Sequence, residues 1–301
     1  MTVDAVTWVN VKAPTKKDIR TLGERFHLSQ LELDDCISKK QLQKIEHHED
    51  HLFAILHFPT SSEKSHLVSS TQIAIFLGES YLVTVHEGVS RAIDEVFESA
   101  RSEAGAKGGA GFLLYRVLDR LVDEIFPLME VILKELEDVE EQVFDEKIEV
   151  VRELTTLRRN IASLRRTVSP LRRIISGLYD EVQMRTPELA ANFRDVNDHI
   201  EKAFAVLEEA RETVEIFKDT DFTVSTERSN KILAVLTIMF TLSIPGTLIG
   251  TFYGMNILLP GGTATGPWTF LGPYTTFALL MALSLSPALI MLWYFHRLGW
   301  V

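Results

Sequence analysis

A stripe of hydroxyl and amide side chains follows one face of an apolar segment near the C-terminus. The stripe consists of Asn230, Thr237, Thr241, Thr247 and Thr251, and the apolar residues Leu233, Leu236 and Ile244 would form constrictions along the same pore. Hydroxyls between narrow apolar constrictions are what a water-filled pore uses when it closes by dewetting. The alternative is that the threonines only stabilise contacts between membrane helices, which is a common use of small polar residues.

A second group with metal-binding chemistry is the run Glu46-His47-His48-Glu49-Asp50-His51, with His57 beyond it. Imidazole and carboxylate groups are typical zinc ligands. However, the run enters an expected strand at a polar turn, and its spacing does not fix three ligands on one face. We therefore interpret it as a feature of the fold rather than as a zinc site.

The motifs of several other function classes are missing from the sequence. No GxxxxGK[ST] phosphate loop occurs, so we expect no nucleotide partner and no ATP-driven step. Cys36 is the only cysteine, which excludes an intramolecular disulfide and agrees with a reducing compartment. We expect no enzyme, no catalytic residue, no resident cofactor and no nucleic-acid partner.

The chain has two uncharged apolar segments, 232–252 and 273–295, and the first of them carries most of the stripe. Each is long enough to cross a lipid bilayer as a helix, which takes about 20 residues, whereas buried helices of a soluble protein would have apolar runs of roughly 10 to 14. All 42 Asp and Glu residues lie before Arg228, so both segments belong to a tail without carboxylates. The sequence predicts an acidic soluble body followed by a membrane hairpin, domain 232–301, with an outer loop at 257–272.

Basic residues lie at the two outer ends of the hairpin, and the loop that connects its two spans carries no charge. Arg228 and Lys231 precede the first span, and His296 and Arg297 follow the second. By the positive-inside rule, both chain ends face the cytoplasm. The N-terminal residues lack the pattern of a signal peptide, so the first span would also serve as the insertion signal. We expect a multi-pass protein of the bacterial inner (plasma) membrane.

The soluble body divides at the glycines of 105–111. Residues 1–111 are expected to form a cytoplasmic α/β domain. Strands are predicted at 6–11, 52–58, 72–77 and 81–85, and helices at 16–26, 29–36 and 90–103. The fold class is thus α+β.

Residues 112–231 are predicted to form a helical hairpin and a stalk. Three helices are expected, at 123–149, at 152–173 and from about 188 onward, the last meeting no Pro or Gly before Pro245. The first carries eleven carboxylates and the second seven arginines, which suits an antiparallel pair. Charged faces that are simply solvated are an equal alternative. Because two spans cannot enclose an ion path, transport would require a homo-oligomer.

With these elements in place, the chain resembles the CorA family of two-span divalent metal channels. The resemblance rests on Tyr253-Gly254-Met255-Asn256 at the outer end of the first span, on Phe193-Arg194-Asp195-Val196 with Asp198 and His199, on Val235-Leu236-Thr237-Ile238, on Ile244-Pro245 and on the basic and aromatic end His296 to Val301. It implies a funnel-shaped homopentamer whose stalk continues into the pore. It also implies that Tyr253, Gly254, Met255 and Asn256 form the selectivity filter.

The implied filter suits a hydrated divalent ion. Mg²⁺ sheds its water reluctantly, and a ring of neutral Asn256 carbonyls would accept hydrogen bonds from that water without trapping the ion. Gly254 would allow a tight turn at the helix end. Many magnesium-selective members continue with Met-Pro-Glu, whereas this chain continues with Ile257-Leu258-Leu259-Pro260. A loop without acids is more similar to the zinc-transporting, ZntB-like branch, so Mg²⁺, Zn²⁺, Ni²⁺ and Co²⁺ all stay open as substrates.

The resemblance further implies regulation by the transported metal. In relatives, metal bridges carboxylates of the α/β domain and the neighbouring stalk and holds the funnel closed. The matching stalk residue is Asp195, with Asp198 one turn on, and Asp94 is the best placement for the partner. A solvated acidic face is the alternative. The sequence thus predicts a divalent metal cation channel, and a non-conducting membrane-anchored scaffold is the competing hypothesis.

Overall fold

The structure is a computed structural model that describes residues 2–3, 6–38, 41–61, 68–88, 91–102, 109–143, 150–255, 259–262 and 265–297. The chain forms two compact units, Met1–Asp221 and Phe222–Val301.

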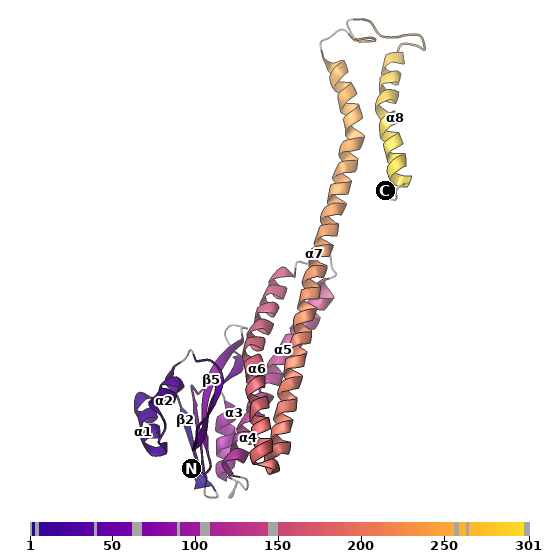
Figure 1. Ribbon diagram of the computed structural model, residues 1–301. Coiled ribbons are helices and arrows are strands. Elements are labelled where there is room, and N and C mark those ends of the chain that lie inside the picture. Colours follow the sequence, from indigo (N-terminus) through magenta and orange to yellow (C-terminus); the bar gives the residue numbers. More distant parts are fainter. Residues whose placement is uncertain are drawn as a thin grey trace. The chain divides into compact units, whose positions relative to one another are not determined.

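A six-stranded mixed sheet is the centre of the first unit (Figure 1). Its strands are β1 (Thr2–Val3), β2 (Val6–Lys12), β3 (Lys44–His47), β4 (His51–Ser61), β5 (Val68–Gly78) and β6 (Tyr81–His86). They lie in the order β1-β2-β6-β5-β4-β3, and only the β2–β6 pair is parallel. The four strands predicted from alternation are confirmed, whereas β3 was not predicted because its four residues are mostly polar.

Two short helices, α1 (Lys16–Phe26) and α2 (Gln30–Ile37), cover one face of the sheet. Each begins with a capping box, in which Thr15 pairs with Asp18 and Ser29 pairs with Glu32. Both helices were predicted, at 16–26 and 29–36, with Thr15 and Ser29 as their caps, whereas the partners Asp18 and Glu32 were not predicted.

The opposite face of the sheet packs against longer helices. These are α3 (Arg91–Ser102), α4 (Gly109–Asp123), α5 (Ile125–Val143) and α6 (Val151–Arg185). The helix predicted over 123–149 corresponds to α5, which begins two residues later, after a break at Glu124, and residues 144–149 lie outside the described residues. The helix α4 before the break was not predicted as a separate element. Pro127 explains the break, since it has no N–H to bond the Asp123 carbonyl but fits the first turn of a new helix.

A short 3-10 turn, η1 (Pro187–Leu189), leads into α7 (Ala190–Gly254), which is a single helix as predicted. Its soluble half buries Phe193, Val196 and Ile200 in the main core. Three ion pairs join it to α6: Arg158 to Glu215 at 3.2 Å, Arg165 to Glu208, and Arg172 to Glu201 at 2.7 Å.

These pairs repeat every seven residues and run in opposite directions along the two helices, so α6 and α7 are antiparallel in one register. Pairing of the arginines with the acidic segment now seen as α5 was one of two alternatives left open by the sequence, and these three arginines pair with α7 instead.

The second unit contains the C-terminal part of α7 and α8 (Thr275–Arg297). Both helices are long and apolar enough to cross a membrane. None of the most apolar stretch of α7 is buried, and only 6% of that of α8 is buried. Helices of a soluble core would be buried, so these surfaces are suited to lipid or to other copies of the chain.

Candidate ion pathway and metal-binding clusters

The predicted pore stripe lies along the C-terminal part of α7. Each of its four threonines donates its hydroxyl hydrogen to the carbonyl four residues earlier, at 2.7 to 2.9 Å. Leu233, Leu236 and Ile244 are 59%, 42% and 52% exposed, and Asn230 is exposed. The stripe is therefore open in the single chain, where water or neighbouring copies can reach it.

The described part of the predicted filter closes α7. The Met255 N–H donates to the Phe252 carbonyl at 3.3 Å, and the Tyr253 hydroxyl donates to the Pro260 carbonyl at 3.2 Å. The second bond ties the end of the helix to the loop that follows. Asn256, on which the filter prediction mainly depends, lies outside the described residues, as do 257 and 258.

The tight turn expected at Gly254 stays a prediction, because residues 256–258 lie outside the described residues. Gly254 is not among the glycines with positive φ, and a Cβ added there would meet nothing within 4 Å. In the outer loop Gly266 and Gly272 have positive φ, as does Gly261, with φ of 75°. A Cβ at Gly261 would come within 3.1 Å of the Trp268 ring, so the backbone of the outer loop approaches the indole closely.

Asp119 of α4 lies beside Asp195 and His199 of α7, and their possible ligand atoms all lie within 4.8 Å of one another. His199 Nε2 is 3.8 Å from Asp195 Oδ1, and His199 Nδ1 is 3.7 Å from Asp123 Oδ1. Burial, reinforced by the charges of Asp123 and Asp195, raises the pKa of Asp119. A divalent cation would relieve the repulsion among the carboxylates of Asp119, Asp123 and Asp195.

The predicted partners of Asp195 are placed elsewhere in the single chain. Asp94 on α3 accepts from Lys12 Nζ at 2.7 Å and from Asn10 Nδ2 at 3.1 Å. Burial alone would raise the pKa of Asp94, but Lys12, His86 and Asn10 together outweigh burial and the net pKa is lowered. Asp198 is exposed on α7 and is not part of the cluster. Asp119 and His199 were not predicted as partners, because only the folded contact of α4 with α7 brings them to Asp195.

The histidine run of the sequence forms the turn between β3 and β4. His48 and His51 both approach Glu32 of α2, and these three residues form a second cluster with metal-binding groups. Burial disfavours the charge on Glu32, but hydrogen bonds from Ser29 and His51 outweigh it, and the pKa of Glu32 is lowered. Glu32 was not predicted as a ligand, because it lies 19 residues from His51 in the sequence.

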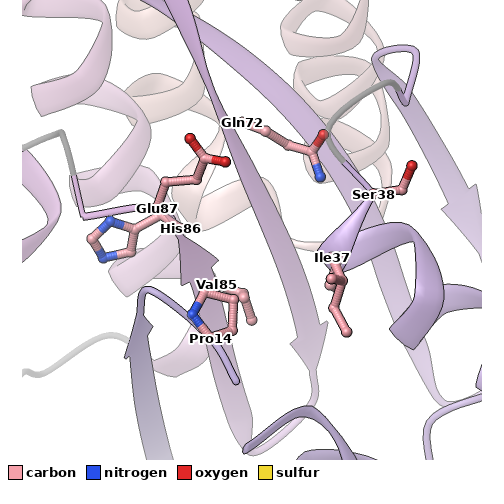
Figure 2. A pocket seen from close by; sticks show the side chains of 8 residues that line it. Pro14, Ile37, Ser38, Gln72, Val85, His86 and Glu87 are labelled. Carbon is pink, nitrogen blue, oxygen red and sulfur yellow. The ribbon is translucent and has the colours of Figure 1, made fainter. Parts of the chain in front are cut away.

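A small hollow lies between the sheet and the end of α2 (Figure 2). It is lined by Pro14, Cys36, Ile37, Ser38, Gln72, Val85, His86 and Glu87. Its volume of about 20 Å³ is room for roughly one water molecule. Burial raises the pKa of the Cys36 thiol to about 12. Cys36 is therefore a protonated core residue rather than a nucleophile.

An α/β domain, a stalk helix that continues into an apolar span, and a second apolar span define a membrane protein of the two-span type. The profile of the CorA-like Mg²⁺ transporter protein family matches residues 3–297. The chain belongs to this family, whose members transport metal cations.

Curated relatives agree with this assignment. The chain is 31% identical to the cobalt/magnesium transport protein CorA of Thermotoga maritima, over 83% of this chain and 73% of the relative. It is 29% identical to the putative metal ion transporter YfjQ of Bacillus subtilis, over 97% of this chain and 89% of the relative.

Solved structures show the same fold. The complete CorA magnesium transporter of Methanocaldococcus jannaschii aligns with a TM-score of 0.80 at 21% identity, over 99% of this chain and 92% of that one. The cytoplasmic domain of ZntB from Vibrio parahaemolyticus aligns with a TM-score of 0.61 at 19% identity, over 74% of this chain and 88% of that one. The fold class predicted from the sequence is therefore confirmed: a soluble α/β domain, a long helix and two apolar C-terminal helices.

Proposed function

We propose that this chain forms a homopentameric channel for divalent metal cations in the bacterial inner membrane, with both termini in the cytoplasm and no catalytic activity. The observation that carries the proposal is α7, a single helix that bears the hydroxyl stripe and ends in Tyr253-Gly254, directly before Met255. The family match over 3–297 supports it. Since two spans per chain cannot surround a pore, five copies place their α7 segments around the axis and α8 outside.

In the proposed channel, Asn256 completes the filter. Its amide oxygens accept hydrogen bonds from the water around the ion, and the neutral ring holds the ion weakly enough to release it. Leu233, Leu236 and Ile244 form the apolar constrictions. The inside-negative potential drives entry, with roughly 4.6 kcal/mol for a divalent charge per 100 mV. The names of the relatives support Mg²⁺ and Co²⁺ as substrates, and the loop without acids supports Zn²⁺ and Ni²⁺.

The test is ion flux into liposomes that contain only this chain. Mg²⁺, Co²⁺, Ni²⁺ and Zn²⁺ are compared side by side, with Asn256→Ala as the variant and Thr269→Ala, an exposed change in the same loop, as the control. We expect Asn256→Ala to abolish flux without changing the oligomer, because it removes the amide that would accept hydrogen bonds from the hydrated ion. Normal flux through Asn256→Ala would show that the filter is misassigned, and no flux in the unaltered protein would favour the scaffold hypothesis.

We further propose that metal bound at Asp195 regulates the channel from the cytoplasmic side. The cluster with Asp119 and His199 supports this, and Asp94 and Asp198 stay candidates for contacts from a neighbouring subunit. The nitrogen of His199 extends the expected metals beyond those that prefer oxygen alone. In Asp195→Asn, inhibition of flux by rising internal Mg²⁺ should shift to higher concentration. An unchanged inhibition curve would remove Asp195 from the regulatory site.

A further inference from the structure

The turn between β3 and β4 holds two histidines against a buried carboxylate. The His48 N–H donates to the His51 carbonyl at 2.9 Å, so the two residues face each other where the hairpin closes. Their side chains share one side of the sheet, because directly opposed residues point the same way. That side is covered by α2, whose first turn carries Glu32.

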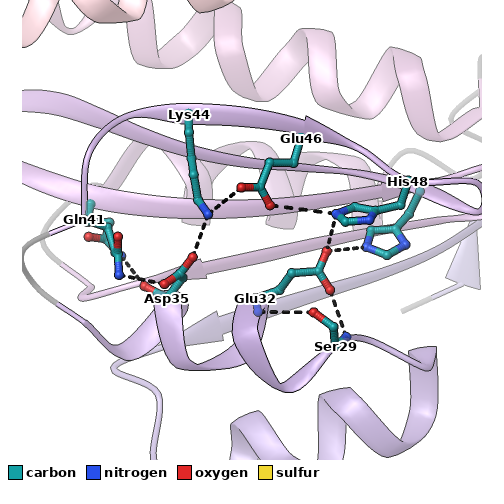
Figure 3. Close-up of polar contacts among 9 residues, drawn as sticks. Ser29, Glu32, Asp35, Gln41, Lys44, Glu46 and His48 are labelled. Atoms are coloured by element: carbon teal, nitrogen blue, oxygen red, sulfur yellow. Dashed lines mark hydrogen bonds and ion pairs between the residues drawn. The ribbon is translucent and has the colours of Figure 1, made fainter.

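Both imidazole rings converge on one oxygen of Glu32 (Figure 3). His48 Nε2 lies 2.9 Å and His51 Nε2 lies 2.8 Å from Glu32 Oε1, and the two rings are stacked with centroids 4.9 Å apart. The second carboxylate oxygen is occupied by the backbone N–H of Ser29 at 2.8 Å. The capping box thus fixes Glu32 with Oε1 directed at the two rings.

We propose that Glu32, His48 and His51 bind a transition-metal ion such as Zn²⁺, Ni²⁺ or Co²⁺. Two imidazole nitrogens and one carboxylate oxygen form a three-ligand set that leaves a fourth position for water. Metal–ligand bonds of about 2.0 to 2.1 Å in a tetrahedron place ligand atoms roughly 3.3 Å apart. The observed separations of 2.8 and 2.9 Å therefore need to open by about 0.5 Å each.

The surroundings of the three ligands also fit a metal site. The side chains of Glu32 and His51 are 3% and 9% exposed, whereas that of His48 is 41% exposed. One ligand thus faces solvent and provides the entry path, while the other two form the buried wall. Glu46 lies 3.8 Å from His48 but is already bound to Lys44 at 2.7 Å, so it is not a ligand. Imidazole ligands select these metals against Mg²⁺, which prefers oxygen.

The bound ion would join α2 to the β3–β4 hairpin within the soluble domain. Neighbouring histidines do not share the site: His47 points to Glu181 of α6, with Nδ1 3.1 Å from Oε2. His47 is therefore a matched control, since it lies next to His48 in the same strand end and carries the same ring.

The test is a Zn²⁺ titration of the full-length protein in detergent, with excess Mg²⁺ and a competing chromophoric chelator. The background variant is Asp195→Asn, which weakens the separate cluster of Asp119, Asp195 and His199. We expect one Zn²⁺ per chain, bound at least about ten-fold more weakly after His48→Gln and equally well after His47→Gln. Equal affinity with and without His48→Gln, or equal weakening by His47→Gln, would overturn the proposal.

A second measurement needs no change at the site itself. One equivalent of Cu²⁺ is added to the Asp195→Asn protein, and pulsed electron paramagnetic resonance counts the coordinated imidazoles. Two histidine nitrogens support the site, and fewer than two contradict it. Both experiments measure binding alone, so their outcome is independent of whether the channel conducts.

Discussion

Exchanging the charges of Arg172 and Glu201 tests the register in which α6 holds the stalk. The guanidinium of Arg172 lies 2.7 Å from the carboxylate of Glu201 and 4.4 Å from the centroid of the Phe204 ring. Three proteins are compared with the unaltered chain: Arg172→Glu, Glu201→Arg and the double exchange. The double exchange restores an ion pair at the same place but leaves the Phe204 ring without its cation.

The expected free-energy changes follow from these contacts. The two side chains are 35% and 43% exposed, so the ion pair contributes roughly 0.2–1 kcal/mol. Opposing like charges costs a similar amount, and the cation–π contact adds about 0.5–1 kcal/mol. Arg172→Glu should therefore destabilise by about 1–3 kcal/mol, Glu201→Arg by about 0.5–2 kcal/mol and the double exchange by only about 0.5–1 kcal/mol.

The assay is thermal unfolding of the detergent-purified protein at low and high salt. Each kcal/mol corresponds to about 2–4 °C in melting temperature for a domain of roughly 150–250 residues. The loss of melting temperature in the two single variants should be smaller at high salt, because salt screens the repulsion between the two like charges. A double exchange that melts below both single variants would refute the antiparallel register.

The remaining predictions concern assembly, the membrane hairpin and pH. A detergent-solubilised particle should have the mass of five 34.1 kDa chains, and a monomer that still transports would contradict the architecture. Gly246→Val should lower the melting temperature, since a Cβ at Gly246 meets Ser284 Oγ at 3.0 Å, and overpacking costs typically about 1–3 kcal/mol; Gly250→Val, where a Cβ meets nothing within 4 Å, is the control, and equal effects would rule out this contact. Burial lowers the pKa of His57, so the unfolded chain takes up the proton first and stability is lost as pH falls below about 6.5. His57→Gln should therefore lose less melting temperature than the unaltered protein between pH 7.5 and 5.5, and an identical loss would remove His57 as a contributor.

Elements whose start or length depends on neighbouring residues could be predicted from the sequence. The capping residues Thr15 and Ser29 indicated the starts of α1 and α2, and the length of the two uncharged apolar segments indicated the membrane spans. Pro127 is a local signal for the break between α4 and α5, but apolar residues three and four apart continue across it from Leu113 to Leu136. The strand β3 offered no signal, since Lys44–His47 is short and polar and is held by its pairing with β4.

The sites depend on contacts between distant residues, which no spacing in the sequence reveals. Glu32 becomes a neighbour of His48 and His51 only when α2 lies on the sheet. Asp119 becomes a neighbour of Asp195 only when α4 lies against α7. The partners of the α6 arginines also depend on the fold. Their positive charge complements the acidic composition of α5, but their seven-residue spacing brings them opposite Glu201, Glu208 and Glu215 of α7.

The bonding of the threonines in α7 has a consequence for the sign of the ion. Each hydroxyl hydrogen of Thr237, Thr241, Thr247 and Thr251 is engaged by a carbonyl of its own helix. In the proposed pore these four hydroxyls then present only oxygen lone pairs to the lumen, and the lone pairs attract the hydrogens of water molecules whose oxygens point at a cation. An anion orients its water the opposite way and finds no free hydroxyl hydrogen on these side chains. The four threonines would thus favour a cation over chloride without carrying a charge.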